Sequence, residues 1–291
     1  MDTPLARELA DLSARRRALE AATVEFTGET RVLTVSNQKG GVGKTTTAVN
    51  IASALAGMGA KVLVIDLDPQ GNASTALGVP HSAEVPSVYD VLIDEFPLAD
   101  IIQESPEDSN LFCAPSTIHL AGAEIELVAQ VAREHRLRRA LEVYLADHPM
   151  DFVIIDCPPS LGLLTINAFT AATEVFIPIQ CEYYALEGLS QLLGSIQMIQ
   201  KHLNPVLHLS TILLTMFDGR TRLAQQVAEE VRTHFPEQVL ETVIPRSVRV
   251  SEAPSFGQTV IAYDGQSAGA IAYREAAVEI ASRTATQSKE K

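Results

Sequence analysis

The sequence predicts an α/β fold in which a doubly wound, mostly parallel sheet is flanked by helices. Short apolar runs rich in β-branched residues alternate with longer segments of helical periodicity. Most of the short runs are nearly continuous, which is typical of strands buried on both faces. The chain has 291 residues, 46% of them hydrophobic, and is therefore large enough for one α/β core and a short appendage.

Candidate strands and helices alternate from residue 31 onward. The expected strands are 31–36, 61–66, 111–116, 151–156, 174–180, 208–216 and 239–244. The expected helices are 45–57, 119–146, 185–203, 221–235 and 268–284. This alternation implies right-handed βαβ crossovers, and such sheets collect their ligands at the carboxyl ends of the strands. Functional residues are therefore expected directly after strands.

Residues 1–30 are expected to form an N-terminal extension, helical or flexible, and residues 31–291 a single domain. Four leucines of the extension share one face of a candidate helix, namely Leu5, Leu9, Leu12 and Leu19. Arg15, Arg16 and Arg17 lie among them. Both a solvated, frayed appendage and a helix that contacts a partner or DNA agree with this pattern.

Charge and hydropathy restrict the function classes. The formal net charge of −14 argues against a protein that coats nucleic acid with its whole surface, so any DNA contact must use a local patch. No apolar run approaches the ~20 residues needed to cross a bilayer, and the N-terminal sequence does not resemble a secretory signal. We therefore expect a soluble, cytoplasmic protein.

The cysteines indicate neither a disulfide framework nor a zinc site. Cys113, Cys157 and Cys181 are widely separated, odd in number and without a CxxC pair. Each lies in or beside an apolar run, and we expect all three to be small buried side chains.

The strongest motif is the glycine-rich segment NQKGGVGKTTT at 37–47, between an expected strand and an expected helix. Glycines let the backbone curl with its N–H groups inward, and the positive end of the following helix adds to an anion cradle. The predicted phosphate loop consists of Gly40, Gly41, Val42 and Gly43.

Three side chains after the loop complete a candidate nucleotide site. Lys44 is placed to reach the β- and γ-phosphates, and the Thr45 hydroxyl to hold Mg²⁺. Thr46 is placed to donate a hydrogen bond to an α-phosphate oxygen. A glycine-rich turn without a ligand is the alternative, but the order strand, glycine loop, Lys-Thr and helix argues against it.

Carboxylates follow two further strands. Asp66 and Asp68 end the run KVLVIDLD, and Asp156 ends DFVIID. We expect Asp156 to hold Mg²⁺, directly or through water, and Asp66 to support the water shell of the metal. A single aspartate after a strand is often only a helix cap or turn residue, but three beside a phosphate loop weaken that interpretation.

The loop departs from the pattern GxxxxGK[ST], because its first glycine would fall at Gln38 and a second lysine, Lys39, is present. This resembles the deviant Walker A motif of the ParA, MinD, ArsA and nitrogenase-iron-protein superfamily. In that superfamily the lysine matching Lys39 crosses a dimer interface to the phosphates of the other subunit. The resemblance therefore implies an ATPase acting as a dimer, with Lys39 and Lys44 as catalytic residues and Asp68 positioning the attacking water.

Five further segments resemble the ParA/Soj group of partitioning ATPases. They are DLDPQGNASTALG (66–78), DCPPSLGLLTINA (156–168), IPIQCEYYALEGL (177–189), LLTMFDGRTRLAQQV (213–227) and IPRSVRVSEAPSFG (244–257). The resemblance implies ATP and Mg²⁺ as cofactors, an ATP-dependent homodimer, non-specific binding to nucleoid DNA and stimulation by a ParB-like centromere-binding partner. It implies a cytoplasmic, nucleoid-associated protein that segregates a chromosome or plasmid.

Four arginines in two short segments favour a basic patch. Arg220 and Arg249 match basic residues associated with DNA binding in the ParA/Soj group, and Arg222 and Arg246 lie near them. The segment IPRSV also resembles a part of the family that borders the adenine. Pro245 and Arg246 are therefore also candidate nucleotide-binding residues.

The chain departs from the family at three positions that are often basic. Family members often carry arginines in a YDPRSRG-like stretch, but this chain has YDGQSAG, with Gln266 and Ala268 at the matching positions. Gln258 replaces a common lysine. Each lost phosphate contact lowers DNA affinity, so we expect weak DNA binding or a contribution from the N-terminal arginines.

Three rival functions use related folds. A MinD-like membrane ATPase would end in an amphipathic anchor, which the tail AAVEIASRTATQSKEK does not resemble. A nitrogenase-type electron carrier is the second rival, and this function would require cysteine ligands for a bridging iron–sulfur cluster. A ParA-like ATPase that positions a non-DNA cargo stays open.

Overall fold

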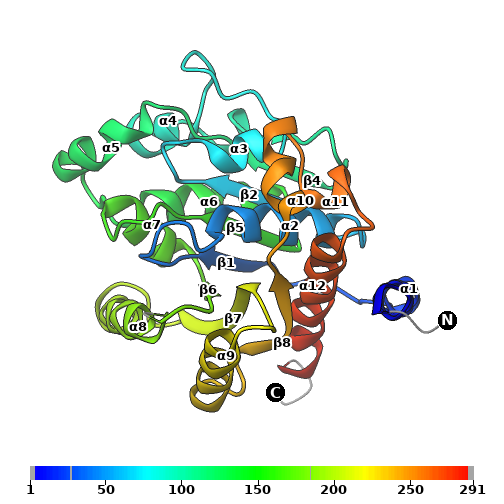
Figure 1. Cartoon of the computed structure of the whole chain (residues 1–291). Helices are drawn as coiled ribbons and strands as arrows, with labels where there is room; N and C mark the ends of the chain where they lie inside the picture. Colours follow the sequence, from blue (N-terminus) through cyan, green and yellow to red (C-terminus); the bar gives the residue numbers. More distant parts are fainter. Residues whose placement is uncertain (1–3, 27, 184, 288–291) are drawn as a thin grey trace.

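The structure is a computed structural model that describes residues 4–26, 28–183 and 185–287 (Figure 1). Its sheet has eight strands in the order β3-β4-β2-β5-β1-β6-β7-β8. Every neighbouring pair is parallel except β3 and β4. Helices cover both faces of this sheet, so the predicted fold class is confirmed.

The strand bounds agree closely with the expected ones. The strands are β1 (Arg31–Val35), β2 (Val62–Asp66), β3 (Gln103–Glu104), β4 (Leu111–Ala114), β5 (Phe152–Asp156), β6 (Glu174–Gln180), β7 (His208–Phe217) and β8 (Val239–Pro245). The two-residue strand β3 was not expected from the sequence, because so short an edge strand has no periodicity to detect.

The described helices are more numerous than the five expected. They are α1 (Pro4–Ala21), α2 (Lys44–Ala56), α3 (Asn72–Ala76), α4 (Val88–Ile93), α5 (Leu120–Glu126), α6 (Arg136–Asp147), α7 (Leu163–Ala171), α8 (Ala185–His202), α9 (Arg222–His234), α10 (Val248–Glu252), α11 (Val260–Tyr263) and α12 (Ala268–Gln287). Three short 3₁₀ turns are η1 (Leu98–Asp100), η2 (Leu127–Ala129) and η3 (Ala253–Phe256).

The single helix expected at 119–146 is wrong, because the structure breaks this segment between α5 and α6. Ala132 has a φ of 51°, which a right-handed helix cannot contain. Asn167 of α7 stabilises the break: its Nδ2 donates to the Arg133 carbonyl at 2.8 Å, and its Oδ1 accepts from the Leu137 N–H at 3.2 Å. A contact from 30 residues away decides this boundary.

The sheet separates two apolar cores. One face packs against α2 and α12, with Ile51, Leu55 and Tyr273 fully buried. The other packs against α4 to α9, and the largest side chains there include Phe169. Cys113, Cys157 and Cys181 are all buried free thiols, so their interpretation as small core side chains is confirmed.

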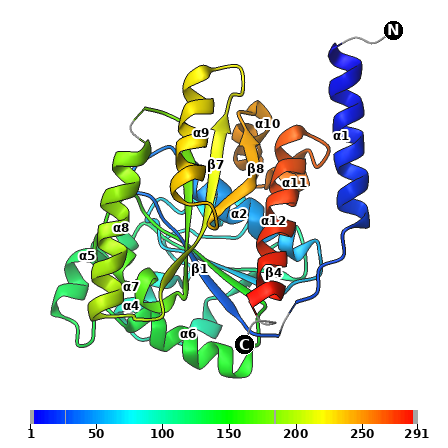
Figure 2. The same cartoon turned by 90° about the horizontal axis from the view of Figure 1, so that it is seen from below.

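Helix α1 lies in the extension expected at residues 1–30, beside α12 (Figures 1 and 2). The domain boundary at residue 31 stays a prediction.

Within the described residues, no helix combines the length and apolarity that a membrane crossing requires. The last residues of the tail used to argue against a membrane anchor, 288–291, lie outside the described part of the chain.

A buried ion pair closes the amino end of the sheet. Arg31 donates from Nε and Nη2 to the two carboxylate oxygens of Glu174, each at 2.7 Å, and from Nη1 to the Ile280 carbonyl at 2.8 Å. Burial alone would raise the pKa of Glu174, but the hydrogen bonds and charge of Arg31 outweigh it and lower the pKa.

We expect Glu174→Gln to lower the free energy of unfolding by about 3 to 5 kcal/mol, because it removes the carboxylate that pairs with the buried Arg31 guanidinium. Because the folded pKa of Glu174 is depressed, the stabilisation is present above the ordinary carboxylate pKa and is lost as pH falls through the folded value. Urea unfolding at several pH values measures this. Glu237→Gln, at an exposed loop position, is the control, and equal losses for the two variants would contradict the prediction.

Candidate active site

The glycine-rich loop between β1 and α2 has the backbone of an anion cradle. Gly41 and Gly43 have φ angles of 75° and 87°, a left-handed region that side chains with a Cβ rarely adopt. Gly43 is the N-cap residue of α2, so the free N–H groups of the first helical turn face the loop. A Cβ built at Gly40 or Gly41 would meet no atom within 4 Å. The loop therefore has open space beside it.

Two neighbouring strands hold this loop in place. The Thr215 hydroxyl of β7 donates to the Val42 carbonyl at 2.8 Å. Asn37 Nδ2 donates to the Pro178 carbonyl of β6 at 2.8 Å, and its Oδ1 accepts from the Lys39 N–H at 3.0 Å. The cradle is thus formed before any ligand binds, which removes much of the ordering cost of binding.

Lys44 is the first residue of α2 and is almost fully buried. Among the described residues, its Nζ donates to the Lys39 carbonyl alone, at 3.3 Å. Burial lowers the pKa of Lys44, and the negative charge of Asp156 opposes this change. A buried ammonium with one neutral partner can take up anionic oxygens as further partners.

Asp66 and Asp156 end adjacent strands and pair in register between β2 and β5. Neither side chain is exposed. Asp66 accepts three hydrogen bonds, from the Asp68 N–H at 3.1 Å and from the N–H and hydroxyl of Ser74 at 2.8 and 2.7 Å. Burial is the main reason that the pKa of Asp66 is raised to about 6. Asp66 therefore anchors the loop before α3 as well as facing the site.

Asp156 is the carboxylate that lacks partners. Neither of its oxygens has a hydrogen bond of acceptable geometry. Burial, followed by the charge of Asp66, raises its pKa well above the usual range, and the Thr45 hydroxyl only partly offsets this. Such a buried carboxylate fits a divalent cation as its missing partner, because the charge of the metal reverses this pKa effect.

The donors present fit Mg²⁺ better than a metal held by protein ligands alone. Within the described residues, no cluster of three or more His, Cys, Asp or Glu could hold a metal ion. Mg²⁺ typically keeps several waters and binds one or two carboxylates together with phosphate oxygens. Asp156 and the half-buried Thr45 meet that requirement.

Asp68 lies two residues beyond the end of β2 and is half-buried. Its Oδ1 accepts from the Gln70 N–H at 3.0 Å. Its charge acts on both Lys44 and Asp156, so the structure brings these three predicted residues together.

Lys39 makes an ion pair that the sequence did not predict. Its Nζ lies 2.6 Å from an oxygen of Glu182, and Gln180 also donates to that carboxylate. Both side chains of the pair are more than 40% exposed, so the contact is weak and easily replaced. Glu182 follows the end of β6, so the strand-end rule that identified the aspartates could have found it. Ser74, in contrast, left no signal in the sequence.

The structure brings the two predicted arginine segments together at the carboxyl ends of β7 and β8. The Arg246 N–H donates to the Phe217 carbonyl at 3.4 Å, so the segment of Pro245 and Arg246 borders the β7–α9 loop. Arg222 begins α9 and is exposed. Thr46, beside Lys44 on α2, is half-buried.

Two of the four predicted DNA-binding arginines have acidic partners within the protein. Arg220 forms two hydrogen bonds with Asp218, each at 2.8 Å, and these chiefly lower the pKa of Asp218 to about 2. Arg249 pairs with Glu252 at 3.3 Å and with Asp264 at 3.5 Å. The basic patch stays a prediction, and the structure adds that acidic side chains lie beside two of its arginines.

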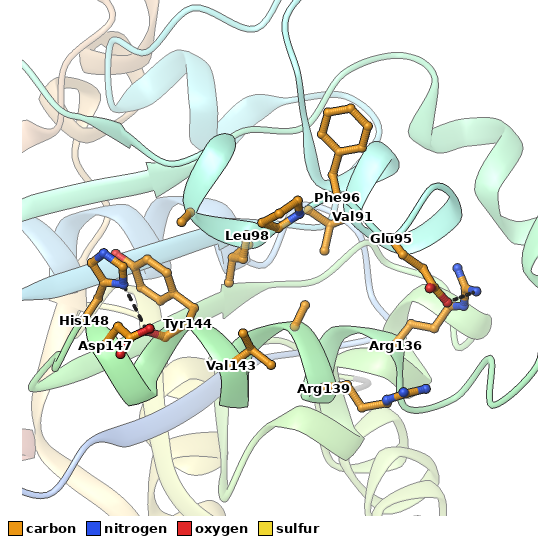
Figure 3. Close-up of a pocket in the computed structure, with 13 residues that line it drawn as sticks. Val91, Glu95, Phe96, Leu98, Arg136, Arg139, Val143, Tyr144, Asp147 and His148 are labelled. Atoms are coloured by element: carbon orange, nitrogen blue, oxygen red, sulfur yellow. Dashed lines mark hydrogen bonds and ion pairs between the residues drawn. The ribbon is translucent and has the colours of Figure 1, made fainter.

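A separate cavity lies between α4 and α6 (Figure 3). It has a volume of about 470 Å³. Arg136 and Glu95 pair at one end, and Tyr144 stacks on His148 at the other. Both helices pack on the sheet face opposite to α2, so this cavity takes no part in the phosphate site.

Sequence comparisons agree with this site. Residues 30–209 match a family model described as an AAA domain. The sporulation initiation inhibitor protein Soj of Bacillus subtilis is 54% identical over 86% of this chain and 98% of that protein. The chromosome partitioning protein ParA of Caulobacter vibrioides is 51% identical over 87% of this chain and 94% of that protein.

Solved structures agree as well. A structure named cobyrinic acid a,c-diamide synthase from Mycobacterium smegmatis, with bound ADP and magnesium, is 41% identical. It covers 86% of this chain and 93% of its own, with a TM-score of 0.73. A second structure of that protein holds an ATP analogue and magnesium.

We expect Lys44→Ala to abolish measurable binding of Mg-ATP, because it removes the buried cation that faces the cradle. Calorimetry measures the affinity. Lys61→Ala, an exposed position before β2, is the matched control and should bind normally. Unchanged ATP affinity in Lys44→Ala would show that the phosphates bind elsewhere.

Proposed function

Because the chain belongs to the ParA/Soj family of chromosome-partitioning ATPases, we propose that it segregates a chromosome or plasmid as an ATP-operated dimer that binds DNA without sequence preference. The relative named as a chromosome partitioning protein is 51% identical, against 41% for the structure named as a synthase. The observation that carries the proposal is the preformed glycine cradle with Lys44 and an unpartnered Asp156 beside it.

In this proposal the chain's own residues bind and orient the nucleotide. The loop N–H groups from Gly40 to Gly43, with Lys44 and Thr46, hold the phosphates. Asp156 and Thr45 hold Mg²⁺, and Asp66 supports its water shell. Bound Mg²⁺ neutralises charge on the phosphate oxygens. Pro245 and Arg246 border the adenine.

Two further residues act on hydrolysis. Asp68 orients a water molecule in line with the terminal phosphate. Its carboxylate lies beyond the strand end and is not needed to bind the nucleotide. Lys39 leaves Glu182 and reaches the phosphates of the other subunit, where it stabilises developing negative charge. The exposed ion pair of Lys39 supports this change of partner, because such a pair costs little to break.

DNA contact is assigned to Arg220, Arg222, Arg246 and Arg249. Phosphate contacts of this kind carry no sequence information, so binding is non-specific. A ParB-like centromere-binding partner stimulates hydrolysis and ends the DNA-bound state. The protein is then nucleoid-associated in the cytoplasm.

The alternative is a ParA-like ATPase that positions a cargo other than DNA. The acids paired with Arg220 and Arg249 favour this alternative more than a fully basic patch would. Size exclusion with ADP or ATP, with and without DNA, decides between them. An ATP dimer that ignores DNA at low salt would select the alternative.

We expect Lys39→Ala to keep ADP binding and to lose both ATP-dependent dimerisation and stimulated hydrolysis, because its phosphate contact lies across the dimer. Size exclusion and phosphate release provide the two measurements. Lys61→Ala should behave as the wild type. A Lys39→Ala protein that dimerises normally with ATP would refute action across the interface.

We expect Asp68→Ala to bind ATP and to accumulate as a dimer on DNA, the opposite of Lys39→Ala. Blocking the chemical step prolongs the state that hydrolysis would end. Phosphate release, size exclusion and DNA retention are measured in one buffer. Hydrolysis at the wild-type rate, or a monomer with ATP where the wild type dimerises, would remove Asp68 from this role.

A further inference from the structure

Helix α1 lies outside the matched family region, which begins at residue 30. It is nevertheless fixed to the core. Arg15 donates from Nε to Glu275 Oε1 at 2.8 Å and from Nη2 to Glu275 Oε2 at 2.5 Å. This hydrogen-bonded pair, half-buried on α12, is the geometry in which arginine binds carboxylates most strongly. Figures 1 and 2 both place α1 beside α12.

A cavity of about 280 Å³ lies between α1, α2 and α12. Its apolar lining includes Ala54 of α2 and Met58, which lies just after that helix. Its charged lining consists of Arg16 and Glu20 from α1 and Arg274 from α12. Two guanidinium groups and one carboxylate therefore share this space.

Neither guanidinium forms a hydrogen bond with a described residue. The Nε of Arg16 is buried without a hydrogen bond, and the nearest ion-pair partner, Glu20, lies 3.6 Å away. Arg274 forms no hydrogen bond or ion pair with any described residue. Buried donors are normally paired, and two arginines in one cavity repel each other unless an anion lies between them.

This cavity continues the arginine segment at α10. Arg274 Nη2 lies so close to Gly265 that a Cβ there would be 3.1 Å from it. The preceding residue, Asp264, pairs with Arg249 at 3.5 Å. The basic side chains missing at Gln266 and Ala268 belong to this same turn.

We propose that Arg16 and Arg274 form a phosphate site, and that its ligand is the backbone of DNA bound at Arg249. The inference rests on the proposed DNA-binding function and adds an element that the family model does not contain. Guanidinium groups match phosphate oxygens in geometry and charge. Continuity with Arg249 favours a polymer of phosphates over a free anion or a lipid headgroup.

The first test compares DNA affinity over a salt series for Arg16→Gln/Arg274→Gln and for Arg138→Gln/Arg139→Gln. The second pair removes the same charge from α6, on the opposite face of the sheet. With ATP present, the first variant should lower the slope of log affinity against log salt by roughly 1.8, about 0.9 per contact. The α6 variant should keep the wild-type slope, and ATP affinity should be unchanged in both.

The second test asks whether removal of an acidic side chain strengthens or weakens DNA binding. Removing an acid normally strengthens binding to DNA, and Glu142→Ala on α6 should do so slightly or have no effect. Glu275→Ala also removes an acid, but it breaks the hydrogen bonds with Arg15 that hold α1 against α12. It should therefore weaken DNA binding and reproduce part of the slope change. Stronger binding by Glu275→Ala would overturn the proposed role of α1.

Three further outcomes are distinguishable. An unchanged slope in Arg16→Gln/Arg274→Gln, with a reduced slope in Arg220→Ala/Arg249→Ala, overturns the inference alone. Wild-type protein that binds no DNA with ATP overturns the proposed function and the inference together. If Arg16→Gln/Arg274→Gln keeps DNA binding but loses binding to vesicles containing anionic lipid, the ligand of the cavity is a lipid headgroup. That result overturns the inference.

Discussion

Lys44 and Asp156 are charged side chains that the fold buries at the start of α2 and the end of β5 without completing their hydrogen bonds. An uncompensated buried carboxylate costs free energy, and the charge of Asp66 beside it adds to that cost. The surrounding sheet must therefore be stable enough to hold these groups in place. Parallel strands with both faces covered, together with the loop anchors from Thr215 and Asn37, provide that rigidity.

Much of the fold was predictable because its signals are local. The seven main strands are continuous apolar runs, and the glycine loop with Lys44 is a contiguous motif. The break between α5 and α6 was not predictable, because Asn167 stabilises it from a distant helix. The edge strand β3 is too short to carry a periodicity.

The candidate site likewise has residues whose place the sequence predicts and contacts that it does not predict. Asp66, Asp68 and Asp156 follow strands, so the position of each in the sequence predicts its place at one edge of the sheet. The pairing of Lys39 with Glu182, and of Asp66 with Ser74, depends on side-chain geometry that spacing does not reveal. The arginines illustrate a third case, since their convergence was predicted but their acidic partners at 218, 252 and 264 were overlooked.

The acids beside Arg220 and Arg249 have a consequence for avidity. Under the proposed function, a DNA phosphate would have to compete with a carboxylate already in place, so one subunit alone would hold DNA weakly. When two subunits are joined, the second contact becomes intramolecular and its effective concentration rises sharply. Overall affinity can then exceed that of one subunit by a factor of about 10² to 10⁴ without any new contact. In the proposed dimer, weak individual sites would thus make the time spent on DNA depend almost entirely on assembly, whereas the same arginines without acidic partners would hold monomers on DNA as well.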